Sequence, residues 1–158
     1  MISNLKDTPQ LEFIPHSLLR IPDNEALFDK VVELKERING MRKPGDAHSA
    51  FSTVYTLAAI NLARCLHDNI GQIVKDLSAL EIESFGKSGT SSAKLSEYHI
   101  NLFDACAATL ALRMRPSPSR TWVRNAAIFL LADVSEPKLF ELLRSLRQPP
   151  EQYVFAIT

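Results

Sequence analysis

Two short motifs in the middle of the chain contain the residue types of nucleotide-binding and acyl-transfer sites. Gly-Lys-Ser at 86–88 resembles the end of a phosphate-binding loop. That loop needs a preceding strand and an earlier glycine, and this chain has Glu81 where the glycine belongs. Ser91 and Lys94 have the spacing of an acylating serine and its lysine partner, without the companion motifs of such enzymes. We therefore interpret 84–92 as an exposed loop rich in glycine and serine, and we expect no cofactor.

The cysteines and histidines offer metal-ligand or nucleophile chemistry only where their spacing brings them together. On a helix Cys65 and His67 point in nearly opposite directions, whereas His99 and Cys106 share a face but supply only two ligands, too few for a zinc site. Arg64 precedes His67 as in some helical ribonucleases, but the gap is shorter than usual and no polar cluster surrounds the pair. We expect no metal site, no catalytic residues and two reduced cysteines that behave as small apolar groups.

An arginine cluster is the clearest candidate for binding an anion. Its four members flank the Pro-Ser-Pro-Ser run at 116–119, and a phosphate or an acidic segment of a partner could bind between them. The net charge of the whole chain is +0, but residues 113–158 hold seven basic and four acidic side chains. The alternative interpretation is a solvated linker. The four residues are Arg113, Arg115, Arg120 and Arg124.

The segment 125–146 resembles a helix-turn-helix, with a tight turn and a valine-serine pair before the second helix. The turn of that motif usually contains a glycine at a left-handed position, and this chain has Asp133 there. The second helix would present a face of mixed charge, which argues against tight phosphate contact. Its basic residue, Lys138, is the fifth expected contact to an anion or nucleic acid, after the four arginines. A plain two-helix hairpin is the alternative. The expected face consists of Glu136, Lys138, Glu141 and Ser145.

The elements that must position these residues are helices. From Ala47 to Phe85, apolar residues recur every three or four positions with no proline, which predicts one long amphipathic helix. Some 36 helical residues would measure about 54 Å, whereas a compact domain of this size is roughly 40 Å across. We therefore expect an elongated molecule in which this helix bends at Gly71, and a break within 68–71 is the alternative.

Four further helices follow from apolar spacing and capping residues. The first begins at Asp23 or Asn24, buries Leu27, Val31, Leu34 and Ile38, and stops at Asn39-Gly40. The others are expected at 92–114, 119–132 and 135–146. The predicted fold class is therefore all-α. We expect a single domain, 1–158, with an irregular N-terminal arm (1–22), an elongated bundle of about five helices (23–148) and a short extended tail (149–158).

The composition of the chain says more about its cellular compartment than about its function. Apolar residues make up 46% and charged residues 23%, which is close to the globular average, so a sizeable core is expected. No run of apolar residues is long enough for a membrane span, and the N-terminus lacks a secretory pattern. We expect a cytoplasmic protein, with the reservation that a non-classical export signal would not be visible.

The predicted inward faces are almost wholly apolar, which leaves no polar cleft for catalysis. We therefore expect a non-enzymatic protein–protein interaction module, such as an adaptor, chaperone, immunity or regulatory protein. Apolar residues near the two ends of the chain would contact a protein partner or a second copy in a homodimer. A DNA-binding regulator that uses 125–146 is the alternative. The expected partner-binding residues are Phe13, Ile14, Tyr153 and Phe155.

Overall fold

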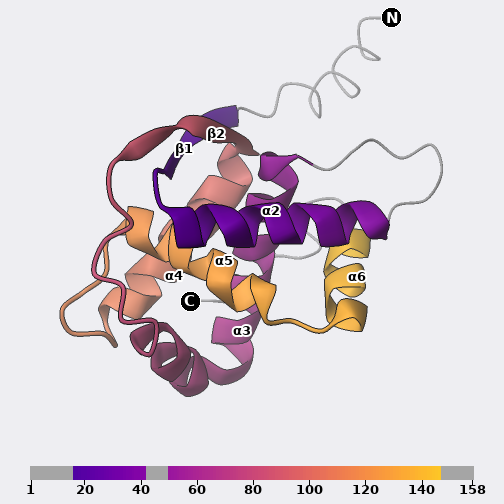
Figure 1. The fold of residues 1–158 in the computed structure, drawn as a ribbon. Helices are drawn as coiled ribbons and strands as arrows, with labels where there is room; N and C mark the ends of the chain where they lie inside the picture. The colour runs from indigo at the N-terminus through magenta and orange to yellow at the C-terminus, as the bar shows by residue number, and fades with distance from the viewer. Residues whose placement is uncertain (1–15, 42–49, 147–158) are drawn as a thin grey trace, which may run out of the picture.

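A computed structural model describes residues 16–41 and 50–146. Within these ranges the chain forms five helices and two strands, and Figure 1 shows the helices packed around one another with the strands at one edge. In chain order the elements are β1 (His16–Pro22), α2 (Glu25–Gly40), α3 (Phe51–Ser78), β2 (Ser88–Ser96), α4 (Glu97–Ala111), α5 (Arg120–Ala132) and α6 (Glu136–Ser145).

One contiguous cluster of buried apolar side chains joins the helices. Helix α5 contacts α2, α3 and α4, so it lies in the middle of the core. The predicted stripe of α2 is confirmed, because all four of its apolar residues have at most 1% of their surface exposed. Burying one such side chain contributes about 1.5–3 kcal/mol, so these residues fix the face that α2 turns inward.

Polar caps set the helix starts where the sequence predicted them. The side chains of Asn24, Ser119 and Ser135 each accept a hydrogen bond from an amide in the first turn of α2, α5 and α6. The stop of α2 differs in detail. The helix includes Gly40, and its cap Met41 has a φ of −96°, so no left-handed glycine is used.

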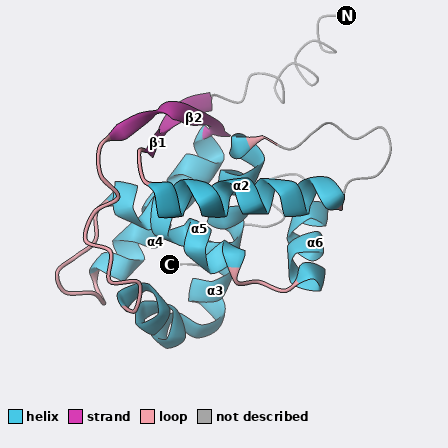
Figure 2. Cartoon of the chain, in the orientation of Figure 1, coloured by secondary structure: helices cyan, strands magenta, loops and turns pink. Residues whose placement is uncertain are grey.

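The two strands correct the all-α prediction. β1 and β2 form an antiparallel pair with Leu19 opposite Ala93 and Pro22 opposite Ser88 (Figure 2). Residues 16–22 are therefore not part of an irregular arm, 88–92 is not a loop, and the helix expected from 92 begins at Glu97. The pair forms because alternate residues face inward, as the burial of Ile21, Ala93 and Leu95 shows.

Helix α3 is shorter than predicted and is interrupted near its middle. Asn69 has non-helical dihedral angles (φ −158°, ψ 77°), and its Oδ1 accepts a hydrogen bond from the amide of Gln72 at 3.2 Å. Asn69 thus acts as the N-cap of a second helical segment. The ribbon of α3 changes direction there (Figure 1), so the bend lies at Asn69 and not at Gly71. None of the helices in the described ranges combines the length and hydrophobicity that crossing a bilayer requires.

Candidate partner-binding groove

The four apolar residues predicted to bind a partner, Phe13, Ile14, Tyr153 and Phe155, lie outside the described residues. The extended tail predicted at 149–158 lies outside them as well. A candidate binding surface in the described part of the chain must therefore be made of other residues.

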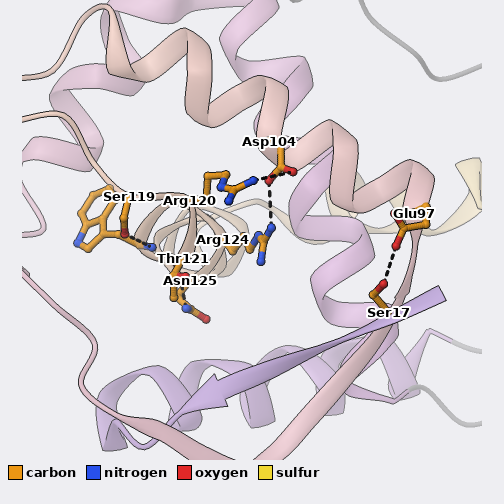
Figure 3. Close-up of polar contacts among 9 residues, drawn as sticks. Ser17, Glu97, Asp104, Ser119, Arg120, Thr121, Arg124 and Asn125 are labelled. Carbon is orange, nitrogen blue, oxygen red and sulfur yellow. Dashed lines mark hydrogen bonds and ion pairs between the residues drawn. The ribbon is translucent and has the colours of Figure 1, made fainter.

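The structure places the four arginines of the predicted anion-binding cluster in different surroundings. Figure 3 shows Arg120 and Arg124 both directed at Asp104 of α4, with N–O distances of 3.6 and 3.0 Å. Arg115 uses its Nη1 to donate to the carbonyl oxygens of Ala111 and Met114 at the end of α4. Arg113 is exposed. The carboxylate of Asp104 therefore takes up part of the positive charge that the sequence suggested for a ligand.

The fifth predicted anion contact, Lys138, is half-buried on α6. Burial raises the pKa of the Cys65 thiol, and the positive charge of Lys138 acts in the opposite direction and lowers it. The ammonium group is thus close enough to α3 for its charge to act on this thiol.

The connection between α5 and α6 is held by Arg37 of α2. Its Nη1 and Nη2 donate to the carbonyl oxygens of Ala132 and Val134 at 3.0 and 2.8 Å, and its Nε donates to Glu136 at 2.7 Å. The cap residue Asp133 has a φ of −88°, so the left-handed turn residue of a helix-turn-helix is missing here.

Both glutamates on the expected DNA-facing side of α6 form ion pairs within the chain, since Glu136 pairs with Arg37. Glu141 pairs with Arg64 at 3.3 Å. Ser145 is buried and donates to the carbonyl oxygen of Leu142, so its predicted exposure on this face is wrong. This arrangement supports a two-helix hairpin more than a helix free to enter a groove of DNA.

The small motifs do not assemble into reactive groups. Ser91 and Lys94 are three apart on β2, so their side chains point to opposite faces of the strand. His99 Nδ1 lies 2.7 Å from the hydroxyl of Ser96, and burial lowers the pKa of this histidine to about 4, helped by the nearby charge of His16. Within 16–41 and 50–146, no three His, Cys, Asp or Glu side chains are grouped as a metal site would require.

The sequence-based reasoning missed an open groove of about 750 Å³, a size that suits a ligand or a short peptide segment. Three segments form it: the end of α3 with the residues that follow (77–83), the proline-rich connection 114–119, and Trp122 on α5. Its apolar lining includes Leu77, Ile82, Met114 and Trp122.

Trp122 anchors one wall of the groove. Its indole Nε1 donates to the carbonyl oxygen of Ile82, which ties α5 to the segment after α3. Phe85 reinforces this link, because its ring lies 6.3 Å from that of Trp122 and 6.0 Å from that of Phe129. The position of Trp122 in this wall is therefore supported by packed aromatic rings behind it.

Two carboxylates outnumber the one guanidinium, that of Arg115, in the lining of the groove. Glu81 and Glu83 line it and are exposed, and neither forms an ion pair with a described residue. Glu81 has a φ of 53°, a left-handed conformation uncommon for a side chain of its size, which marks the sharp turn after α3. Along the chain next to the groove, Leu112 is 78% exposed. The face is therefore apolar with an acidic margin.

One signal in the sequence points toward this groove: two prolines at 116 and 118 stand shortly before the lone tryptophan of the chain. Prolines keep the connection out of a helix, and a half-buried tryptophan is a frequent anchor at interfaces.

In comparisons with known proteins, the chain matches no family model, no curated protein and no solved structure.

Proposed function

We propose that this chain is a non-enzymatic protein–protein interaction module that binds a short segment of a partner in the groove formed by 77–83, 114–119 and Trp122. The observation that carries this proposal is the combination of an apolar floor with two carboxylates that form no ion pair with a described residue. Such a surface needs an apolar group to cover it and a positive charge to balance it.

The lining of the groove favours binding over catalysis. Its titratable residues are Glu81, Glu83 and Arg115, and its hydroxyls come from serines. A serine becomes a nucleophile only beside a base that takes its proton, and neither histidine nor cysteine lines this groove. The residues present can hold a peptide through apolar contact and charge, without bond-breaking chemistry.

The chemistry of the groove specifies the partner segment. We expect an extended stretch with one large apolar side chain against Trp122 and one or two lysines or arginines beside Glu81 and Glu83. Exposed ion pairs contribute only about 0–1 kcal/mol each, so the apolar contact must supply most of the affinity. A dissociation constant of about 1–100 μM is expected, which corresponds to roughly 5–8 kcal/mol.

A peptide-display selection against the purified protein tests this proposal. Enriched peptides should share an apolar residue next to a basic one. The Kd of the best peptide should rise at least tenfold for the double variant Glu81→Lys/Glu83→Lys. The matched control is Asp29→Lys/Glu36→Lys, which changes the net charge equally on exposed positions of α2 outside the groove. This control should alter the Kd less than twofold.

Two results would refute the proposal. In the first, the selected peptides bind both double variants equally well. In the second, their NMR footprint lies away from Trp122. A homodimer would mean that a second copy supplies the segment, and light scattering of the wild-type protein distinguishes this case.

DNA binding through 125–146 is the alternative function. A gel shift at low ionic strength tests it, because counterion release makes even non-specific complexes strong there. If no complex forms, DNA binding is excluded. A salt-sensitive complex that Lys138→Gln weakens would favour DNA binding over the peptide groove.

A further inference from the structure

A second, smaller pocket lies between β1 and the first turns of α5, away from the groove residues. Its volume is about 150 Å³. Tyr55 and Asn125 are almost fully buried, whereas Arg20, Ser88 and Thr121 are exposed, so the pocket has a buried floor and a mouth at the surface. The polar residues that line it are Arg20, Tyr55, Ser88, Thr121, Arg124 and Asn125.

The neutral groups of the floor bond to one another. The hydroxyl of Tyr55 donates to Oδ1 of Asn125 at 2.7 Å, and Nδ2 of Asn125 donates to the carbonyl oxygen of Thr121 at 2.9 Å. These bonds fix the two side chains in place. The floor is therefore rigid before any ligand arrives, which lowers the entropy cost of binding.

Arg124 is different, because part of its guanidinium group lacks an acceptor. Its Nη2 donates to Asp104 at 3.0 Å (Figure 3), but its Nε is buried and has no hydrogen-bond partner in the described part of the chain. A buried N–H of a charged group that stays unsatisfied is costly, by about 1–3 kcal/mol or more. The guanidinium group of Arg124 is therefore only partly paired by the chain itself.

The charges around this pocket favour a negative occupant. Arg20 and Arg124 both line it, and no aspartate or glutamate does. Arg20 forms no ion pair with a described residue, and Arg120 and Arg124 share the single negative charge of Asp104. Guanidinium groups bind oxyanions with paired, charge-assisted hydrogen bonds.

We propose that this pocket binds a single phosphate group through the guanidinium groups of Arg20 and Arg124 and the hydroxyls of Ser88 and Thr121. Nucleotide-sized ligands occupy about 300–1,000 Å³, so a volume of about 150 Å³ admits the phosphate but not an attached nucleoside. The ligand is free phosphate or the phosphate end of a small monoester. The site is independent of the peptide groove, so either can fail without the other.

The test follows the Nε–Hε signals of arginine by NMR, because these report changes in the hydrogen bonding and charge around each guanidinium group. The wild-type protein is titrated with inorganic phosphate at constant ionic strength, and in parallel with methyl phosphate and with acetate. The Nε–Hε signals of Arg124 and Arg20 should shift in a saturable way with phosphate, whereas that of Arg113, which is exposed and does not line the pocket, should not. Stronger binding of methyl phosphate would identify a monoester as the source, and equal or weaker binding would identify free phosphate.

Variants assign the interaction to these side chains. Arg124→Lys can keep its ion pair with Asp104 but has no Nε–H, and Arg20→Gln removes an exposed charge, so both should fold and weaken phosphate binding at least tenfold. Arg113→Gln is the matched control and should change the Kd for phosphate less than twofold. The proposal is overturned if the Nε–Hε signals of Arg124 and Arg20 in the wild-type protein do not shift at any phosphate concentration reached in the titration. It is also overturned if acetate binds as well as phosphate, or if all three variants weaken phosphate binding equally.

Discussion

Gly89 on β2 provides the most direct test of the strand pair, which the sequence did not predict. A Cβ atom added there would lie 2.8 Å from the carbonyl oxygen of Ile21 and 3.4 Å from the amide nitrogen of Asp23. Contacts this short do not persist, so Gly89→Ala must push β1 and β2 apart near the paired residues Pro22 and Ser88. Both atoms at the contact belong to the backbone, which cannot rotate away as a side chain would.

The expected cost follows from opposing terms. Crowding of a packed site lowers the free energy of unfolding by about 1–3 kcal/mol. Replacing glycine by alanine also reduces the conformational entropy of the unfolded chain, which raises the free energy of unfolding by about 0.4–1 kcal/mol. Gly89→Ala should therefore destabilise the protein by about 1–2 kcal/mol, or roughly 2–8 °C in Tm for a chain of this size. Gly71→Ala is the matched control, because its new Cβ would meet only Asn69 Oδ1 at 3.8 Å, and it should be neutral or stabilising by up to about 1 kcal/mol.

Urea unfolding followed by circular dichroism measures both variants against the wild type. The m-values should stay equal, because neither substitution changes the surface exposed on unfolding. A Gly89→Ala variant as stable as Gly71→Ala would refute the reasoning and would mean that the two strands are not packed as closely as described.

Three further predictions concern buried polar groups. Tyr55→Phe should lose about 1–3 kcal/mol in urea unfolding, because it leaves Oδ1 of Asn125 buried without its donor; no loss would contradict the hydrogen bond. The pKa of His99 is lowered from 6.5 to about 4, so between these pH values His99 is protonated in the unfolded chain but neutral in the folded chain. Stability should therefore fall by up to about 3 kcal/mol between pH 6.5 and 4, and the fall should be smaller in His99→Gln; equal pH profiles would contradict it. Burial raises the pKa of Cys106 to about 12, so mass spectrometry after native alkylation should show the half-buried Cys65 modified first, and faster labelling of Cys106 would count against its burial.

The helices were predictable because their signals are local. Apolar residues at helical spacing and the capping side chains of Asn24, Ser119 and Ser135 lie within a few residues of the elements that they define. The strands had no such signal, because β2 is rich in serine, and its partner β1 lies far away in the sequence. Strand formation depends on that partner more than on intrinsic preference, so a local pattern suggested a loop.

The candidate sites were harder to predict, because each is made by segments that meet only after folding. The sequence showed four neighbouring arginines but not that Asp104 of α4 would pair with Arg120 and Arg124. It also showed Trp122 without indicating that the turn containing Glu81 would lie beside it. Periodicity tells which side of a helix is buried, whereas the identity of the neighbour across a groove depends on how several elements pack.

Because α3 is interrupted at Asn69, the few residues there determine how its second segment is rotated about the helix axis, and therefore which side chains face the groove. Each residue in a helix turns the chain by about 100°, so inserting or deleting one residue just after Asn69 would rotate the remainder of α3 by that angle. Leu77 would then leave the groove wall, while the core residues before Asn69 would keep their places. The length of this short stretch therefore sets which residues of α3 face the groove, and it also sets whether Ile73 and Leu77 stay buried in the core.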